Sequence, residues 1–236
     1  MAGEHKTRAV ALLSGGLDSC VATTWGARRY EVWVLHADYG QRTAARERRA
    51  FDAIGDALGV PAERRLTFQA EVLRWIGGSS LTDFDLPVEQ GEPDPARIPG
   101  TYVPFRNTHL LAAAVSWAEV LGALRVIIGC VEEDSSGYPD CRANYVAAFN
   151  RVAEAGTRPG SGIVVEAPLI ALRKKDIVRM GVELGAPLDR TWSCYSGTEV
   201  ACGACESCRL RLRGFREAGV PDPIPYVQGR VAGDLR

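Results

Sequence analysis

The motif Ser-Gly-Gly-Leu-Asp-Ser at residues 14–19 combines two glycines with hydroxyl and carboxylate groups, directly after the apolar run of residues 9–13. This order predicts a glycine turn between a buried strand and a helix. Backbone N–H groups in such a turn converge on phosphate oxygens, and the positive end of the helix dipole adds to the attraction. Glycine leaves room for the anion and tolerates the positive φ expected there. Asp18 or Ser19 is expected to cap a helix that begins near Cys20.

The motif lacks the lysine and the spacing of a Walker loop. It resembles instead the loop of the PP-loop ATP pyrophosphatases. That resemblance implies that the outer two phosphates are held while a substrate attacks the α-phosphorus, which yields AMP and pyrophosphate. An ordinary glycine turn is the alternative. The residues expected to bind ATP are Leu13, Ser14, Gly15, Gly16, Leu17, Asp18 and Ser19.

Four of the seven cysteines, at positions 194, 202, 205 and 208, form the pattern C-x7-C-x2-C-x2-C. Two-residue gaps let consecutive thiolates point at one ion, and the more distant Cys194 completes a tetrahedron. Four sulfur ligands leave no open coordination position, so a structural zinc ion is expected. An iron–sulfur cluster, which also takes four cysteines, is the competing interpretation.

Four arginines follow the cysteines, at positions 209, 211, 213 and 216. They could contact RNA, as a zinc knuckle can. They could equally form the solvated face of a short helix. A net charge of −1 argues against a broad nucleic-acid surface, so the second interpretation is favoured and no nucleic-acid partner is expected.

The composition, 46% apolar and 24% charged, is typical of a globular domain, and 236 residues suit one α/β domain with a small appendage. No apolar stretch reaches the length of a membrane span, and the polar start is unlike a signal peptide. The seven cysteines fit a reducing compartment if they are free or bind metal. We therefore expect a cytoplasmic protein without membrane contact.

Strand and helix patterns alternate along most of the chain, which predicts a parallel sheet flanked by helices. Strands are predicted over residues 9–13, 31–37, 64–68, 125–129 and 163–167, and helices over residues 20–29, 43–58, 107–121, 142–155 and 174–184. Residues 77–104 are rich in glycine and proline and are expected to form an irregular segment, with a lid as one use. We expect an ATP-binding domain over residues 1–186 and a four-cysteine zinc module over 187–236, packed on the same domain.

Further segments occur in a characteristic order. They are Asp-Tyr-Gly-Gln-Arg at 38–42, Tyr-Val-Pro-Phe-Arg-Asn at 102–107, Asp-Ser-Ser-Gly-Tyr-Pro-Asp-Cys-Arg at 134–142, Pro-Leu at 168–169, Lys174, and Ser-Cys-Tyr at 193–195. Together with residues 14–19, this series resembles the QueC family of 7-cyano-7-deazaguanine synthases in queuosine biosynthesis, from about residue 10 to residue 222. The resemblance implies a Rossmann-like fold of the adenine nucleotide alpha hydrolase type, a structural zinc ion, and a homodimer.

The family converts 7-carboxy-7-deazaguanine and ammonia to a nitrile, using ATP. A carboxylate must first become an acyl adenylate, ammonia then gives an amide, and a second activation allows elimination to the nitrile. By resemblance, the SGGLDS turn holds pyrophosphate with Mg²⁺, and Lys174, Asp18 and Arg106 are the candidate catalytic residues. Lys174 would neutralise charge at the α-phosphate. A solvated lysine at a helix start is an equal alternative.

The candidate substrate-binding residues are Arg106, Asn107, Asp134, Tyr138, Asp140 and Arg142. Arg106 would pair with a phosphate or with the substrate carboxylate, and a surface salt bridge is the alternative. The 134–142 segment follows a strand at the edge where ligands bind in open α/β sheets. A carboxylate there would read the N–H edge of a guanine-like base, and Tyr138 would stack on it. A helix-capping role is the alternative for Asp140.

One cysteine, Cys141, and one histidine, His36, are expected to be structural. Cys141 has no histidine close in sequence to activate it, so a buried thiol is favoured over a nucleophile. His36 ends an apolar strand and is likewise expected to be structural. No general base is identified.

Phe105 departs from the family pattern, which more often has a small residue before Arg-Asn. A phenylalanine there could reshape the pocket, which leaves open a paralogue that adenylates a different acceptor. Two other classes remain. A tRNA-thiolating PP-loop enzyme would need a reactive cysteine outside the zinc set, for which only Cys20, Cys130 and Cys141 are available. A non-enzymatic zinc-knuckle RNA-binding protein would leave the SGGLDS motif unexplained.

Overall fold

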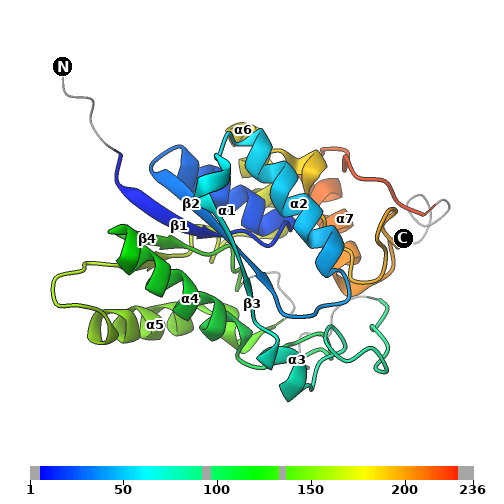
Figure 1. Ribbon diagram of the computed structural model, residues 1–236. Coiled ribbons are helices and arrows are strands. Elements are labelled where there is room, and N and C mark those ends of the chain that lie inside the picture. The colour runs from blue at the N-terminus through cyan, green and yellow to red at the C-terminus, as the bar shows by residue number, and fades with distance from the viewer. Residues whose placement is uncertain (1–5, 92–96, 133–136, 228–236) are drawn as a thin grey trace.

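The sheet lies at the centre of the molecule, between two layers of helices (Figure 1). The computed structural model describes residues 6–91, 97–132 and 137–227. Its strands are β1 (Arg8–Leu12), β2 (Glu31–Asp38), β3 (Arg65–Gln69), β4 (Arg125–Ile127) and β5 (Val164–Glu166). They are all parallel, in the order β3-β2-β1-β4-β5. The predicted fold class is therefore confirmed.

The apolar run that contains β1 is central because both faces of the sheet are covered. Ala9 pairs with Val32 of β2 on one side and with Arg125 of β4 on the other. Along the run, alternate residues join opposite layers. Ala9 and Ala11 contact one hydrophobic cluster, whereas Val10 and Leu12 contact the other.

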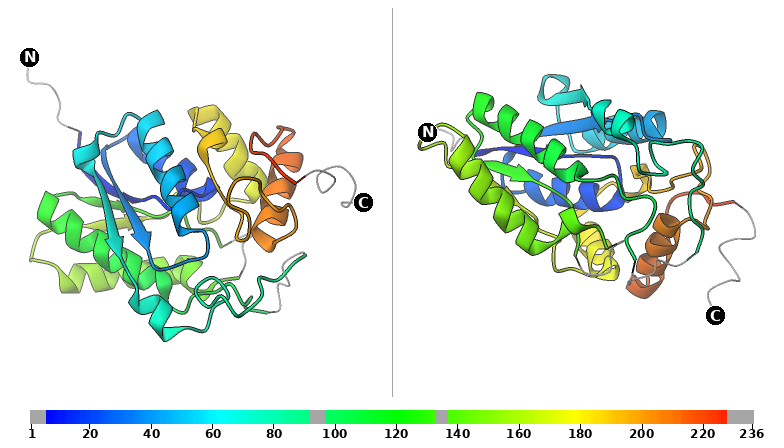
Figure 2. Two further views of the ribbon diagram at one scale, coloured as in Figure 1. Left: turned by 45° about the vertical axis from the view of Figure 1, so that its right-hand side comes forward. Right: turned by 90° about the horizontal axis from the view of Figure 1, so that it is seen from below.

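Two groups of helices form the layers on either side of the sheet (Figures 1 and 2). One layer contains α1 (Leu17–Ala27), α2 (Ala44–Ala57), α6 (Lys174–Leu184) and α7 (Glu206–Ala218). The other layer contains α4 (Arg106–Leu121) and α5 (Ala143–Gly156). The five-residue helix α3 (Val72–Ile76) follows β3, and single 3-10 turns occur at Ala62–Arg64, Pro139–Cys141 and Leu188–Arg190.

The predicted elements agree with the structure to within a few residues, with one informative exception. Helix α1 begins at Leu17 and not near Cys20, so the expected caps Asp18 and Ser19 lie inside the helix. Gly16 is the N-cap residue, and no side chain caps the helix. The capping prediction is therefore wrong, and both side chains are free for other contacts. Helices α3 and α7 were not among the predicted helices.

The irregular segment lies against the cysteine region. Of residues 77–104, those described form no helix or strand apart from a single bridge between Gln90 and Cys205. Gly91 N also donates to Ala204 O at 3.0 Å. The C-terminal region in turn contributes to the main core, because α7 packs on α6 and Phe215 is buried in the hydrophobic cluster of that layer. In the described part of the chain, no helix has the length and hydropathy to cross a membrane.

Candidate active site

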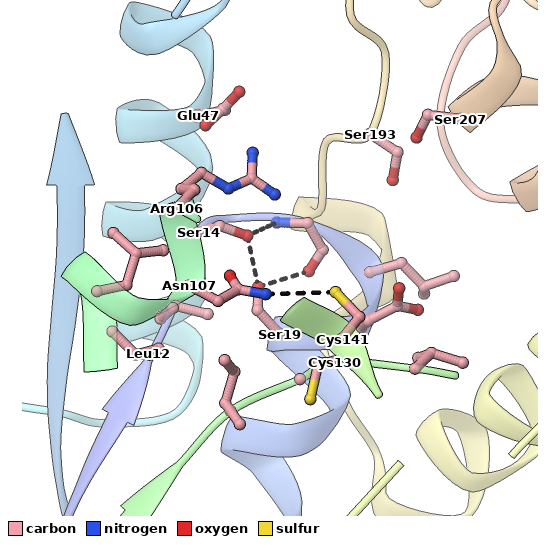
Figure 3. A pocket seen from close by; sticks show the side chains of 18 of the residues that line it. Leu12, Ser14, Ser19, Glu47, Arg106, Asn107, Cys130, Cys141, Ser193 and Ser207 are labelled. Carbon is pink, nitrogen blue, oxygen red and sulfur yellow. Dashed lines mark hydrogen bonds between the residues drawn. The ribbon is translucent and has the colours of Figure 1, made fainter. Parts of the chain in front are cut away.

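A pocket of about 280 Å³ opens at the carboxyl ends of β1, β2 and β4. In parallel sheets, ligands bind at this edge where neighbouring strands connect in opposite directions, and β1 with its neighbours β2 and β4 forms that point here. The walls come from the turn after β1, the ends of β2 and β4, the start of α4, and the segments around residues 138–141, 192–195 and 207–211. Figure 3 shows part of this lining.

The SGGLDS turn forms one wall of the pocket. Gly15 has φ of 93°, which confirms the expected left-handed glycine. Ser14 Oγ accepts a hydrogen bond from Gly16 N at 3.2 Å and lies 3.0 Å from Ser19 Oγ (Figure 3). The first backbone N–H groups of α1 have no partner within the helix. They lie at the positive end of the helix dipole, which is at the pocket. The turn is therefore built to receive an anion.

The close approach of β4 to this turn depends on Gly129. A Cβ at that position would lie 2.8 Å from Ser19 N and 2.9 Å from the carbonyl carbon of Asp18. Both are backbone atoms that cannot move without displacing the start of α1. Gly129 therefore sets how closely the end of β4 approaches the anion-binding turn.

Lys174 and Asp18 form a charged pair on the pocket wall. Lys174 Nζ donates to both carboxylate oxygens of Asp18, at 2.9 and 2.7 Å, and the lysine side chain is only 9% exposed. Helix α7 presses on this lysine, because Gly214 lies directly against the Lys174 side chain. The alternative of a solvated lysine at a helix start is therefore wrong, since the ammonium group is held beside the turn.

Arg106 lies among tyrosines. Its guanidinium donates to the Tyr39 hydroxyl at 2.9 Å and lies 5.6 Å from the Tyr39 ring and 5.9 Å from the Tyr138 ring. Burial raises the pKa of Tyr39 to about 12 and also raises the pKa values of Tyr138 and Tyr195, so these phenols stay neutral at physiological pH. Among the described residues, no carboxylate lies within ion-pair distance of Arg106.

Asp140 and Asn107 are joined by two hydrogen bonds. Asp140, only 3% exposed, accepts a hydrogen bond from Asn107 N at 2.8 Å, while Asn107 Nδ2 donates to Asp140 O. The carboxylate thus satisfies a free amide in the first turn of α4. The capping alternative describes Asp140, although the helix that it caps is α4 and not the following α5. Asn107 reaches the pocket and also donates to Cys141 Sγ at 3.3 Å (Figure 3).

The other candidates divide between the pocket and the surface. Tyr138 lines the pocket, and its hydroxyl is 2.8 Å from Thr101 Oγ1. Arg142 is exposed and does not line it. Asp134 lies outside the described residues. Phe105 is 57% exposed and is also absent from the lining, so it does not reshape this pocket.

Several lining residues were not predicted. Tyr39 belongs to the 38–42 segment, which contributed to the family resemblance, but no role was predicted for this tyrosine. Glu47 follows on α2, and a polar residue on a helix gave no separate signal. Ser207 and Arg211 come from α7, which was not a predicted helix. Cys130 and Cys141 also line the pocket, and burial raises the pKa of both thiols, to about 11 for Cys141.

The four cysteines of the C-terminal region converge. Their sulfur atoms all lie within 4.8 Å of one another, and Cys202 Sγ is 3.9 Å from Cys208 Sγ. Four ligands at about 2.3 Å around a tetrahedral zinc ion give sulfur–sulfur distances of about 3.8 Å, so the cluster fits that ion. Backbone amides of Ser196, Gly197 and Cys202 donate to Cys194 Sγ, as they would to a thiolate ligand. The four sulfur atoms could therefore hold one metal ion.

Arg211 corrects the interpretation of the arginine-rich helix. It is 1% exposed and forms two 2.8 Å hydrogen bonds with the Asp222 carboxylate. It also donates to Thr191 Oγ1 at 2.7 Å. The expected solvated arginine face is therefore wrong for Arg211, whose charge ties α7 to the segments on both sides of it.

Trp192 connects the anion-binding turn with the four-cysteine cluster. Its backbone N–H donates to Gly15 O at 2.8 Å, its indole N–H donates to Cys194 O, and Arg46 stacks on its ring at 4.3 Å. One residue thus contacts both the turn and the first metal ligand.

The parallel sheet, the SGGLDS turn at the reversal of strand order, and the lysine beside it define the PP-loop class of ATP-binding α/β proteins. The chain belongs to the family described as queuosine biosynthesis protein QueC, whose model matches residues 8–219. Among its relatives, the 7-cyano-7-deazaguanine synthase of Acidobacterium capsulatum is 57% identical over 94% of this chain and 97% of its own. The enzymes of the same name from Koribacter versatilis and Chloroherpeton thalassium are 54% and 52% identical, over 96% and 93% of this chain and 95% and 96% of their own.

Proposed function

We propose that this protein is a 7-cyano-7-deazaguanine synthase, a carbon–nitrogen ligase of queuosine biosynthesis. It converts 7-carboxy-7-deazaguanine and ammonia to the nitrile, with ATP cleaved to AMP and pyrophosphate. The relatives that match nearly its whole length support this, since all three carry that name. The observation that carries it is a cationic Arg106, without a carboxylate partner in the described residues, in the same pocket as the anion-binding turn.

In the first step, the turn holds the pyrophosphate part of ATP. The amides at the start of α1 and the hydroxyls of Ser14 and Ser19 face the outer phosphates, whose charge is shared with Mg²⁺. Asp18 keeps Lys174 beside the turn, and the lysine stabilises the charge that develops at the α-phosphate. The substrate carboxylate attacks the α-phosphorus, so an acyl adenylate forms and pyrophosphate leaves.

Arg106 orients the substrate carboxylate toward ATP. A guanidinium can bind a carboxylate through two parallel hydrogen bonds, and neutral tyrosines around it do not compete for its charge. Tyr138 offers an aromatic face for the deazaguanine ring, and Asn107 offers the oxygen of its side-chain amide at the same wall. After ammonia gives the amide, the same groups serve a second adenylation, and elimination of AMP leaves the nitrile.

The metal at Cys194, Cys202, Cys205 and Cys208 is proposed to be structural zinc. Its four sulfur ligands leave no position for substrate, and it supplies a rigid link for the segment behind Trp192. Thiolation of tRNA is disfavoured by the protonated state of the two pocket thiols, because a thiol with a raised pKa is a poor nucleophile.

The remaining expectations accompany this function as proposals. The protein works as a homodimer in the cytoplasm on small molecules, without binding nucleic acid directly. Residues 1–186 act as the ATP-binding domain and residues 187–236 as the zinc module. A lid over the substrate is one use proposed for the 77–104 segment.

The direct test is mass spectrometry of the purified protein supplied with 7-carboxy-7-deazaguanine, ATP, Mg²⁺ and ammonium. We expect the nitrile together with AMP and pyrophosphate. Release of AMP without nitrile would mean a different acceptor. Absence of ATP turnover from a protein with its metal in place would overturn the proposed function.

A further inference from the structure

Glu47 is a pocket-lining carboxylate whose orientation is fixed by two neutral donors. Gln41 Nε2 donates to one of its oxygens at 2.8 Å, and Thr43 Oγ1 donates to the other, also at 2.8 Å. Gln41 is buried and is itself held, because its Oε1 accepts a hydrogen bond from Tyr39 N at 3.0 Å. Each carboxylate oxygen keeps further acceptor capacity toward the pocket.

The Asp-Tyr-Gly-Gln-Arg segment therefore positions two opposite charges. The Tyr39 hydroxyl holds Arg106, whereas Gln41 holds Glu47. The phenol of Tyr39 lies close to both, since Arg106 lowers its pKa and Glu47 raises it, although burial has the larger effect. Figure 3 shows that the two side chains come from different helices, Glu47 from α2 and Arg106 from α4.

Glu47 differs from the other carboxylate of the lining. In the described residues, the acidic residues of the pocket wall are Asp18 and Glu47. Asp18 is neutralised by Lys174, but no lysine or arginine of the described chain forms an ion pair with Glu47. Glu47 is thus the carboxylate of this wall that can still accept a proton or a cation.

The position of Glu47 indicates whether it accepts a proton or a cation. Its helix touches the anion-binding turn, because a Cβ on Gly15 would lie 2.7 Å from the backbone oxygen of Glu47. A carboxylate that reads the far edge of a base would lie at the other end of the substrate. Glu47 instead lines the same pocket from a helix that packs on the anion-binding turn, on the side where the proposed function places the phosphates and the reacting carboxylate.

We propose that Glu47 is the general base of this ligase and takes a proton from ammonium. This inference rests on the proposed function. Ammonium gives one proton to the carboxylate and becomes ammonia. The ammonia lone pair forms the C–N bond, the bond between the acyl carbon and the AMP oxygen breaks, and AMP leaves with the electron pair and one nitrogen proton. Protonated Glu47 then returns its proton to solvent.

The test separates the two halves of the reaction in Glu47→Gln. Without ammonium, pyrophosphate release from ATP and 7-carboxy-7-deazaguanine measures acyl adenylate formation, and we expect it to stay within about twofold of wild type. Amide formation after ammonium is added should fall by about 10²-fold or more, a typical contribution of general base catalysis. Raising the pH toward the pKa of ammonium should restore the variant, because free ammonia then needs no base.

Two further variants guard against a merely structural effect. Glu47→Asp keeps a carboxylate and should retain part of the amide-forming rate with a wild-type pH profile. Asp52→Asn removes a charge from the same helix at an exposed site, where Asp52 pairs with Arg48, and should leave both half-reactions unchanged.

Three outcomes would overturn the role of Glu47. Equal loss of both half-reactions would make it a binding or structural residue. A deficit that persists at high pH would exclude a base for ammonium. A higher Mg²⁺ requirement for pyrophosphate release would make it a metal ligand. If wild type itself gives no nitrile, it is the proposed function that fails.

Discussion

Phe105 is held in the left-handed region, with φ of 59° and ψ of 21°, and no other non-glycine residue of the described chain has a positive φ. This conformation is strained for a side chain with a Cβ. Its exposed ring contributes little burial. We expect Phe105→Gly to raise the free energy of unfolding by roughly 0.5–1 kcal/mol, the relief of strain less the added entropy of the unfolded chain. Urea denaturation would measure it.

Phe105→Ala is the matched control. It removes the ring but keeps the strained backbone, so it should bring no gain in stability. An equal gain from both variants would show that the ring, and not the backbone, is unfavourable. Because Phe105 does not line the pocket, we also expect both variants to form the same product as wild type.

His36 makes stability depend on pH. The ring is 1% exposed, and its Nδ1 lies 3.1 Å from Leu13 O, with Phe51 packed against it. Burial lowers its pKa below the ordinary value of 6.5, so the unfolded chain binds a proton at a higher pH than the folded one does. The free energy of unfolding should therefore fall as the pH drops below about 6.5.

The comparison is between wild type and His36→Asn, each unfolded in urea at pH 7.5 and pH 5.5. Wild type should lose more stability over this interval than the variant, which lacks the titrating ring. Identical losses would mean that other groups carry the pH dependence.

At the scale of elements, two glycines at helix positions should respond oppositely to the same substitution. Gly214 of α7 lies against Lys174 of α6, and a Cβ there would overlap its Cγ and lie 3.0 Å from its Cβ. Gly156 ends α5, and a Cβ there would meet nothing within 4 Å. We expect Gly214→Ala to cost about 1–3 kcal/mol and Gly156→Ala to gain about 0.4–1 kcal/mol.

The same pair of variants tests the position of Lys174. Gly214→Ala moves the lysine or its helix, so pyrophosphate release at saturating ATP should fall, whereas Gly156→Ala should leave it unchanged. Unaltered release from a folded Gly214→Ala protein would contradict the role given to Lys174.

The elements themselves were predictable to different degrees. The strands followed from apolar runs between glycine- and proline-rich turns, and the 174–184 helix matches α6 to the residue. Helix α7 was not predicted because its apolar residues are interrupted by arginines, one of which is buried by the tertiary partner Asp222. The partnership of Asp140 with Asn107 was equally hidden, since it joins residues 33 positions apart. The hydrophobic pattern of the sequence therefore indicates helices and strands. Contacts between residues far apart in the chain decide which polar side chains remain available to bind a ligand.

At the scale of the whole molecule, the metal centre and the anion-binding turn share one support. The segment that carries Cys194 begins at Trp192, whose backbone N–H donates to Gly15 O. It is followed by α7. In that helix Arg211 pairs with Asp222, and Gly214 lies against Lys174. Both sides of the ATP site are thus braced by the C-terminal region. The cysteine cluster, 194–208, is therefore expected to affect ATP binding without touching ATP.

Removal of the metal tests this coupling. Metal analysis should first find one zinc per chain and no visible absorbance of an iron–sulfur cluster. After chelation, hydrogen exchange measured by mass spectrometry should accelerate in peptides covering residues 194–208 and also in those covering residues 13–19, because the bond from Trp192 N to Gly15 O loses its anchored donor. Peptides from α5, which packs on the other face of the sheet, should not change. ATP affinity should fall in parallel, and exchange confined to residues 194–208 would mean that the turn stands without the metal.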